Sequence, residues 1–166
     1  MPGAADTPAV RTASPSEFGR LRWIEIESDR LYDQVGIGPF VNDEAENHLA
    51  VAATGLVAGD PAVGFVSLEI VDGAVHIDQL SVLPSHGRRG IGLALLDEAT
   101  CWARTCGHHT MTLTAFRDVP WNAPFYRRHG FETMSDPGPG LAAIREHERE
   151  VGLDAHGPRV AMRLAL

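Results

Sequence analysis

The clearest chemical pattern in this chain lies between Leu80 and Leu96. Leu80-Ser81-Val82 reads as the end of a strand, and Arg88-Arg89-Gly90-Ile91-Gly92-Leu93 reads as a tight turn that opens a helix. Backbone N–H groups in the first turn of a helix have no acceptor inside the helix, so they form a positively polarised nest that suits a phosphate. The two arginines add fixed charge and forked donors. The segment therefore predicts a pyrophosphate-binding site.

The elements around this turn predict a mixed α/β fold. Strands are expected at 8–13, 48–54, 62–71, 74–83, 109–116, 130–135 and 159–164, and helices at 14–34, 88–104, 122–129 and 141–151. Asp72-Gly73 predicts a hairpin turn. Because a helix joins the strands at 74–83 and 109–116, these two are expected to be parallel neighbours. The result is a mixed sheet with helices on its faces.

Composition limits the class of protein. The 166 residues predict one domain spanning 1–166, with a disordered tail at 1–6 and an insert at 136–158 before the last strand. The formal net charge of −8 disfavours nucleic acids and anionic membranes as partners. No apolar leader or membrane-spanning run is present, so a cytoplasmic location is expected. Cys101 and Cys106 stand five apart on one predicted helix, which favours two buried thiols over a disulfide.

Three motifs follow one another along the chain: Leu80-Ser81-Val82-x-Pro84, then Arg89-Gly90-Ile91-Gly92-x-Ala94-Leu95, then Asn122 with Phe125-Tyr126-Arg127-x-x-Gly130-Phe131. In this order they resemble the GNAT family of acetyl-CoA-dependent N-acetyltransferases, over roughly residues 10–131 and the last strand. Gly87 stands where that family usually has Gln or Arg, and Asn122 lies closer to Tyr126 than is common in the family.

The resemblance implies acetyl-CoA as co-substrate, no metal, and a primary amine as acceptor. It implies a mostly antiparallel twisted sheet in which the strand at 74–83 carries a bulge and splays from the strand at 109–116. The pantetheine arm would pair with the backbone of Leu80 and Val82 in that gap, and a backbone N–H near Leu80 would polarise the thioester carbonyl. The implied cofactor-binding residues are Leu80, Ser81, Val82, Arg88, Arg89, Gly90, Ile91, Gly92, Leu93, Asn122 and Phe125.

Transfer to an amine needs a base, because deprotonating an amine of pKa ~10.4 at neutral pH costs roughly 4 kcal/mol. His76 and Asp78 stand two apart on the strand at 74–83, so they share a face and lie about 6.6 Å apart along it. The resemblance makes Asp78 the first candidate for the base and His76 the second. It assigns Tyr126 as general acid or thiolate stabiliser. Neither cysteine is at a motif position, which favours direct attack in a ternary complex over an acetyl-enzyme.

Several alternatives stay open at this point. A non-catalytic acyl-CoA-binding or sensor module would keep the turn and leave Asp78 and Tyr126 idle. A dinucleotide-binding oxidoreductase is suggested by Gly90-x-Gly92, but the third glycine position holds Leu95. The acceptor stays open between a small amine, an aminoglycoside, an amino acid, a polyamine and a protein N-terminus or lysine, and the net negative charge favours a cationic small-molecule amine. A homodimeric state is not fixed by the sequence either.

Three local features also have competing interpretations. Arg117, Asp118 and Trp121 line the acceptor pocket, or Trp121 only fills the core. His108-His109 is interpreted as a surface or strand-start pair rather than a metal site. The helix at 141–151 carries Glu146, Glu148 and Glu150. These glutamates are expected to face solvent rather than an acceptor or a second subunit.

Overall fold

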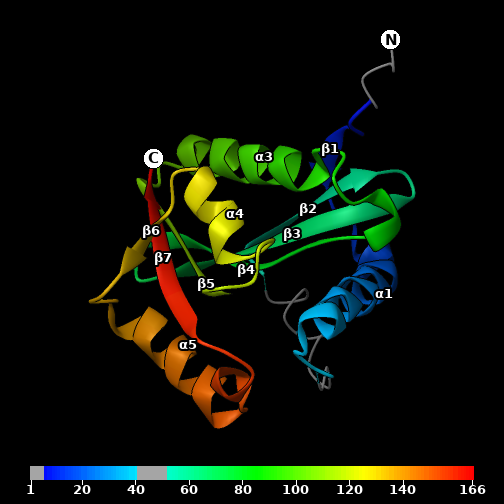
Figure 1. The fold of residues 1–166 in the computed structure, drawn as a ribbon. Coiled ribbons are helices and arrows are strands. Elements are labelled where there is room, and N and C mark those ends of the chain that lie inside the picture. The colour runs from blue at the N-terminus through cyan, green and yellow to red at the C-terminus, as the bar shows by residue number, and fades with distance from the viewer. Residues whose placement is uncertain (1–5, 41–51) are drawn as a thin grey trace.

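The computed structural model describes residues 6–40 and 52–166, which form a seven-stranded sheet (Figure 1). Across the sheet the strands are β1 (Val10–Thr12), β2 (Thr54–Gly59), β3 (Ala62–Val71), β4 (Ala74–Val82), β5 (Thr110–Phe116), β7 (Arg159–Ala165) and β6 (Glu132–Met134). Only β4 and β5 pair in parallel, and the other neighbours are antiparallel. The predicted mixed sheet with one parallel pair is therefore confirmed.

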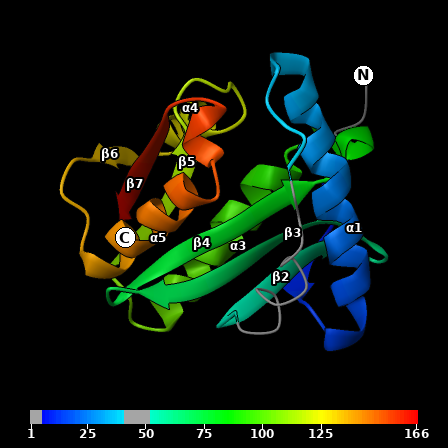
Figure 2. The ribbon, with the colours of Figure 1, turned by 90° about the horizontal axis from the view of Figure 1, so that it is seen from below.

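Helices cover both faces of this sheet (Figures 1 and 2). The helices α3 (Ile91–Thr105) and α4 (Ala123–Arg128) lie over one face. The helices α1 (Phe18–Asp29) and α5 (Pro139–Glu150) lie over the other. Short 3-10 turns precede and follow α1, at Pro15–Glu17 and Arg30–Val35, and another follows α5 at Leu153–Ala155. No helix among the described residues is long and apolar enough to cross a lipid bilayer.

Alternation along the strands builds the two apolar layers. Leu56 and Val66 pack in the same buried cluster as Leu95 of α3. The adjacent residues Val57 and Phe65 point to the opposite face, where they pack with Leu21 and Ile24 of α1. Period-two patterning of this kind places one apolar side chain on each face in turn, so both faces require a covering helix.

The strand expected at 48–54 is placed too early in the sequence. In the structure β2 begins at Thr54 and runs to Gly59, in register with β3 from Thr54↔Leu68 to Gly59↔Ala62. The turn at Asp60-Pro61 joins the two strands, so β2 occupies the residues directly before this turn. Gly55 and Gly59 are therefore part of the strand. Residues 48–51 lie outside the described part of the chain, as do residues 1–5 of the expected tail and 41–47 of the expected loop.

The predicted burial of the two cysteines is wrong. Cys101 and Cys106 are both exposed free thiols. Cys101 stands four residues after Asp97 and three after Glu98, so helical geometry places it on the solvated face of α3. Cys106 follows the last residue of α3, at its C-cap. The expectation that they form no disulfide is confirmed.

Candidate functional site

The strand β4 carries a bulge at Asp78. Ser67 of β3 pairs with Gln79, and Leu68 pairs with Ile77, so Asp78 is the extra residue between two paired positions. A bulge of this kind redirects side chains and increases the local twist, and it is common beside active sites. The predicted bulge in this strand is therefore confirmed.

Beyond the bulge, β4 separates from β5. The parallel pairing covers only Val75↔Met111 and His76↔Thr112. The N–H of Leu83 donates to the carbonyl of Val63 on β3 (2.9 Å), and backbone groups alternate sides along an antiparallel strand. The N–H and C=O of Leu80 and Val82 therefore point away from β3, toward the gap. The predicted splay leaves a strand edge open at these two residues.

The Gly/Arg turn starts α3 in a strained conformation. Gly90 is the N-cap with φ +77°, and Arg88 also lies in the left-handed region at φ +60°. Ala94 N–H donates to Gly90 C=O (2.9 Å), so the amides of Ile91, Gly92 and Leu93 belong to the first turn and lack an intrahelical acceptor. Arg88, Arg89 and Gly90 are exposed. This is the geometry of an anion-binding helix start.

The turn and the open strand edge meet at Gly92. A Cβ at Gly92 would stand 3.9 Å from Leu80 Cδ2 of β4 and 3.8 Å from Phe125 Cζ of α4. Ser81 is buried in the adjoining strand, and its hydroxyl accepts a hydrogen bond from Gln79 Nε2 (2.8 Å). The predicted cofactor-binding residues thus gather where β4, α3 and α4 converge.

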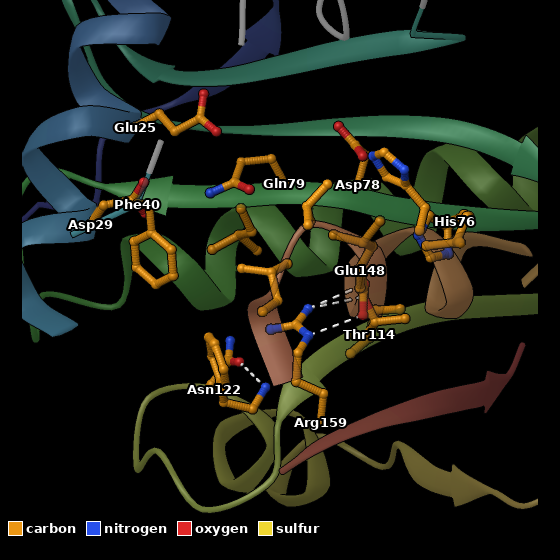
Figure 3. Close-up of a pocket in the computed structure, with 18 of the residues that line it drawn as sticks. Glu25, Asp29, Phe40, His76, Asp78, Gln79, Thr114, Asn122, Glu148 and Arg159 are labelled. Atoms are coloured by element: carbon orange, nitrogen blue, oxygen red, sulfur yellow. Dashed lines mark hydrogen bonds and ion pairs between the residues drawn. The ribbon is translucent and has the colours of Figure 1, made fainter. Parts of the chain in front are cut away.

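A cavity of about 920 Å³ lies on the α1 and α5 side of the splay (Figure 3). Its walls come from α1, β3, β4, β5, α4, α5 and β7, and they include His76, Asp78 and Tyr126. Leu80 and Leu113 line it from the two separated strands. All three residues predicted to act in catalysis therefore face one cavity that reaches the open edge of β4.

His76 and Asp78 reach this cavity in different environments. His76 is only 2% exposed, and its Nδ1 lies 3.0 Å from Thr112 Oγ1 of β5. Burial lowers the pKa of His76, so the ring is neutral at pH 7. Asp78 is exposed, and its carboxylate accepts a hydrogen bond from Ser67 Oγ (3.4 Å). The two groups are a neutral imidazole and an accessible carboxylate at one bulge.

Tyr126 comes from α4, on the far side of the splay. Its ring packs edge-on against Phe131 (5.5 Å between centroids) and Phe125 (5.2 Å). The residue is 6% exposed, and burial raises the pKa of its hydroxyl, which therefore stays protonated at neutral pH. Asn122 lines the same cavity at the N-cap of α4. Its Oδ1 accepts a hydrogen bond from Phe116 N–H rather than capping the helix, which ties α4 to the end of β5.

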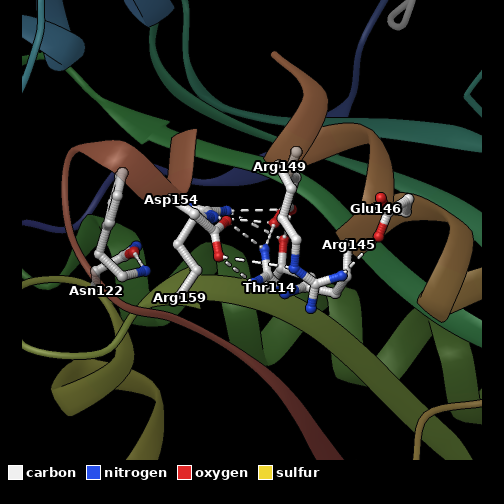
Figure 4. A network of polar contacts seen from close by, with 9 residues as sticks. Thr114, Asn122, Arg145, Glu146, Arg149, Asp154 and Arg159 are labelled. Carbon is white, nitrogen blue, oxygen red and sulfur yellow. Dashed lines mark hydrogen bonds and ion pairs between the residues drawn. The ribbon is translucent and has the colours of Figure 1, made fainter. Parts of the chain in front are cut away.

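A buried ionic network joins α5 to the cavity wall (Figure 4). Glu148 accepts hydrogen bonds from Arg159 Nε (3.0 Å) and Nη2 (3.2 Å), from Arg145 Nη1 and from Thr114 Oγ1. Arg145 also donates to both carboxylate oxygens of Asp154, at 2.9 and 2.7 Å. Glu148 and Arg145 are each 7% exposed. The network fastens α5 to β5 and β7.

This network corrects the prediction for the helix at 141–151. Glu146 and Glu150 are solvated, as expected, with side chains 62% and 68% exposed, but Glu148 is buried. Burial alone would raise the pKa of Glu148; hydrogen bonds and charge from Arg159, with those from Thr114 and Arg145, outweigh it and lower that pKa. Glu148 is therefore held as a carboxylate, and its oxygens are occupied by donors, which suits a structural group better than a base.

Asp72 is a residue whose role sequence reasoning missed. Both Asp72 (φ +53°) and Gly73 (φ +77°) have the left-handed geometry of the predicted hairpin turn. The Asp72 carboxylate also accepts from the N–H groups of Gly140 (2.8 Å) and Leu141 (2.9 Å) at the start of α5. A carboxylate there satisfies free amides and complements the helix dipole. The β3–β4 turn thus positions the helix that walls the cavity.

The other residues with competing interpretations from the sequence, Arg117, Asp118, Trp121 and His108, do not line the cavity. Arg117 and Asp118 are exposed and pair with each other (2.9 Å). Trp121 packs with a small core cluster, its ring 5.5 Å from that of Tyr32, which supports the core interpretation. His108 Nδ1 lies 3.1 Å from the carbonyl of Gly73.

Comparisons with known proteins agree with this geometry. A family model described as "Acetyltransferase (GNAT) domain" matches residues 45–133, more than half of the chain. The fold is similar to that of the PaiA N-acetyltransferase from Thermoplasma acidophilum in complex with coenzyme A. The TM-score is 0.68 at 17% identity, over 95% of this chain and 98% of that one.

Two further solved structures have the same fold. A GNAT family acetyltransferase from Brucella melitensis in complex with acetyl-CoA matches with TM-score 0.57 at 22% identity, over 75% of this chain and 82% of that one. The N-acetylglutamate synthase from Neisseria gonorrhoeae, complexed with coenzyme A and N-acetyl-glutamate, matches with TM-score 0.68 at 20% identity. That match covers 95% of this chain and 35% of the longer protein.

Proposed function

Given that this chain belongs to the acetyltransferase (GNAT) family, we propose that it transfers the acetyl group of acetyl-CoA to a primary amine by direct attack in a ternary complex. The observation that carries the proposal is the open edge of β4 at Leu80 and Val82, which joins the Gly/Arg turn to the cavity at Asp78. The diphosphate end of acetyl-CoA would lie at the Gly/Arg turn, and its thioester end would lie at the cavity beside Asp78.

The residues present fit acetyl-CoA. The outward N–H and C=O groups of Leu80 and Val82 suit the amides of a pantetheine arm, which pair as an added strand would. The amides of Ile91, Gly92 and Leu93, with Arg88 and Arg89, suit its pyrophosphate. Phe125 and Asn122 border this path from α4. Acetyl-CoA supplies the activated acetyl group.

Asp78 is the first candidate for the base that deprotonates the amine. Its carboxylate projects from the bulge into the cavity and is exposed to water, so it can accept a proton directly or through a water molecule. His76 is the second candidate, because its lowered pKa keeps the ring neutral. Its burial and its contact with Thr112 restrict access, which favours Asp78.

Tyr126 is proposed to stabilise the departing thiolate. A thiol of pKa about 8.5 is a stronger acid than a tyrosine whose pKa is raised by burial. Full proton transfer from Tyr126 to the sulfur is therefore uphill, whereas hydrogen-bond donation is favourable. The position of the cysteines supports direct attack over an acetyl-enzyme formed on a thiol. Cys101 lies on α3 and Cys106 follows it, and neither lines the cavity.

Acetyl-CoA is expected to raise the melting temperature by about 5 to 10 °C at about 100 times its dissociation constant, and thiol release should follow when a primary amine is added. Acetyl-pantetheine, which lacks the diphosphate, is the matched ligand control and should give a smaller shift. An unchanged melting temperature with millimolar acetyl-CoA would contradict the proposal, and so would failure of every amine to release thiol.

The Asp78→Asn substitution is expected to lower kcat/KM about a hundredfold, near the low end for losing a general base, because His76 remains in the cavity. The readout is thiol release as a function of pH, with acetyl-CoA binding followed by thermal shift. Glu69→Gln is the matched control, since Glu69 lines the same cavity and loses the same charge. An equal loss in both variants would point to electrostatics rather than to a base, and a loss seen only in His76→Gln would move the role to His76.

A further inference from the structure

The last residue of β5 faces the gap that the splay opens. The N–H of Arg117 donates to the carbonyl of Pro158 beside β7 (2.8 Å), and backbone groups alternate sides along a strand. The N–H of Phe116 therefore points away from β7, to the side from which β4 has separated, since the pairing of β4 and β5 ends at His76↔Thr112. Phe116 is only 3% exposed, and a buried N–H without a partner costs free energy. The splay thus creates a need for an acceptor at this point.

Asn122 supplies that acceptor. Its Oδ1 accepts a hydrogen bond from Phe116 N–H (2.5 Å), the dashed contact at Asn122 in Figure 3. The N–H of Asn122 donates to the carbonyl of Val119 (2.9 Å), which closes the loop between β5 and α4. An Asn side chain at a helix N-cap usually accepts from the first turn of its own helix, but Asn122 makes no such bond. Its side chain instead takes the place that a neighbouring strand would have beside β5.

The same residue fixes the start of the helix that carries Tyr126. The N–H of Tyr126 donates to the carbonyl of Asn122 (3.2 Å), and the carbonyl of Tyr126 accepts from the N–H groups of His129 (3.0 Å) and Phe131 (3.1 Å). The helix α4 has six residues, too few to be stable alone, so its orientation depends on contacts with the rest of the fold. Among these contacts, the one from the Asn122 side chain links α4 to β5.

This link bears on the chemistry because Asn122 and Tyr126 stand about one turn apart on α4 and both line the cavity. Leu80 lines the same cavity from β4, where the thioester is proposed to lie, and β4 is joined to β5 by their short parallel pairing. The distance from the Tyr126 hydroxyl to the sulfur therefore depends on how α4 is held against the end of β5. A misplacement of about 1 Å can cost on the order of a hundredfold in rate.

We propose that Asn122 is a positioning residue for Tyr126: its Oδ1 closes the end of β5 at the splay and thereby holds α4 so that the Tyr126 hydroxyl faces the thioester sulfur. This inference rests on the proposed function and adds a residue to it. Because Oδ1 is occupied by Phe116 N–H, the side chain does not use this oxygen to bind acetyl-CoA. Asn122 contributes to kcat through Tyr126 and contributes little to the affinity for the cofactor.

Two substitutions separate positioning from cofactor binding. Asn122→Ser can still cap α4, but its hydroxyl is too short to reach Phe116, so kcat should fall about tenfold to a hundredfold while KM for acetyl-CoA changes little. Asn122→Asp keeps an acceptor oxygen in place and loses the amide donor, so it should retain most of the kcat. Thiol release gives both constants, and melting curves show that each variant is folded.

Thr100→Ala is the control for the loss of one side-chain hydrogen bond to the backbone. The Thr100 hydroxyl donates to the carbonyl of Leu96 on α3 (2.8 Å), and Thr100 does not line the cavity. This variant should therefore retain the wild-type kcat, whatever its effect on the melting temperature.

Two further measurements test the route of the effect. Since Asn122 acts through Tyr126, the Asn122→Ser/Tyr126→Phe double variant should lose no more kcat than Tyr126→Phe alone. Amide hydrogen exchange followed by NMR reports the contact itself. The N–H of Phe116 should exchange slowly in the wild type and in Asn122→Asp, and at least about tenfold faster in Asn122→Ser.

A raised KM for acetyl-CoA with unchanged kcat in Asn122→Asp would assign the amide to cofactor binding and overturn this inference. Losses of kcat that multiply in the double variant, or fast exchange of Phe116 N–H in the wild type, would overturn it as well. Asn122→Asp and the wild-type exchange rate decide the matter even if Asn122→Ser does not fold. Absence of thiol release by the wild type with every amine would instead overturn the proposed function, and these outcomes are therefore distinguishable.

Discussion

Replacing Tyr126 by Phe is expected to lower kcat by about 10²- to 10³-fold, the loss typical of removing one donor to a developing negative charge. The ring is kept, so its packing against Phe131 and Phe125 is retained and the fold should be unaffected. Since the proposed hydrogen bond from the hydroxyl to the sulfur forms only as the C–S bond breaks, KM should change little. Thiol release at saturating amine measures kcat, and thermal shift measures acetyl-CoA binding.

Tyr32→Phe is the matched control for this substitution. Tyr32 is the other tyrosine on the cavity wall and is half-buried, but it lies in the aromatic set with Phe40 and Trp121 rather than on α4. It should retain most of its kcat. If Tyr126→Phe turned over at the wild-type rate, Tyr126 would have no role in the chemistry. A chain that binds acetyl-CoA but never releases thiol would instead be a non-catalytic binding module.

The Gly/Arg turn and the parallel pair of strands could be predicted from the sequence because their causes lie in neighbouring segments of the chain. Gly90 adopts positive φ, which glycine allows, and the residues that follow it carry a helical apolar pattern. Adjacent residues therefore suffice to predict the nest of free N–H groups at the start of α3. The parallel pairing of β4 and β5 follows from the helix that connects them. The resemblance to a family added the bulge and the splay, which no local pattern specifies.

The walls of the cavity could not be predicted in the same way, because their residues meet only in the folded chain. Glu148 has the helical surroundings of a solvated residue, and it is buried because Arg159, eleven residues later, returns beside it on β7. Asp72 is a turn residue by its neighbours and a helix cap by its contact with α5, 68 residues away. Both roles depend on contacts between segments that are distant in the sequence. The hydrophobic period and the helix or strand propensity of a segment do not predict such contacts.

The strand β2 lies later in the sequence than the local pattern predicted, at Thr54–Gly59 instead of 48–54. Gly55 and Gly59 weaken its strand propensity, yet β2 lies between β1 and β3, and both neighbours pair with it. A Cβ at Gly55 would stand 3.4 Å from Ala13 Cβ, an ordinary contact. Pairing on both edges therefore overrides the low propensity of glycine at this position.

The Glu148→Gln substitution is expected to destabilise the protein by about 3 to 5 kcal/mol at pH 7, because it leaves the buried guanidinium of Arg159 without its carboxylate and removes one of the two carboxylates paired with Arg145. Glu148 accepts from Arg159 and Arg145, and all three side chains are at most 10% exposed. Urea unfolding followed by circular dichroism gives the free energy of unfolding. Glu146→Gln, on the same helix and paired with Arg149 on the surface, should cost less than about 1 kcal/mol.

The pH dependence separates the charge of Glu148 from its packing. The folded state lowers the pKa of Glu148 below its ordinary value of 4.5, so the stability it contributes is present above that pH. It is lost as the pH falls through the lower, folded-state pKa, where the protonated side chain resembles Gln. The difference in unfolding free energy between wild type and Glu148→Gln should therefore be constant near pH 7 and narrow below about pH 4.5. A difference that stayed the same down to the acid transition would mean that the network stabilises α5 by packing alone.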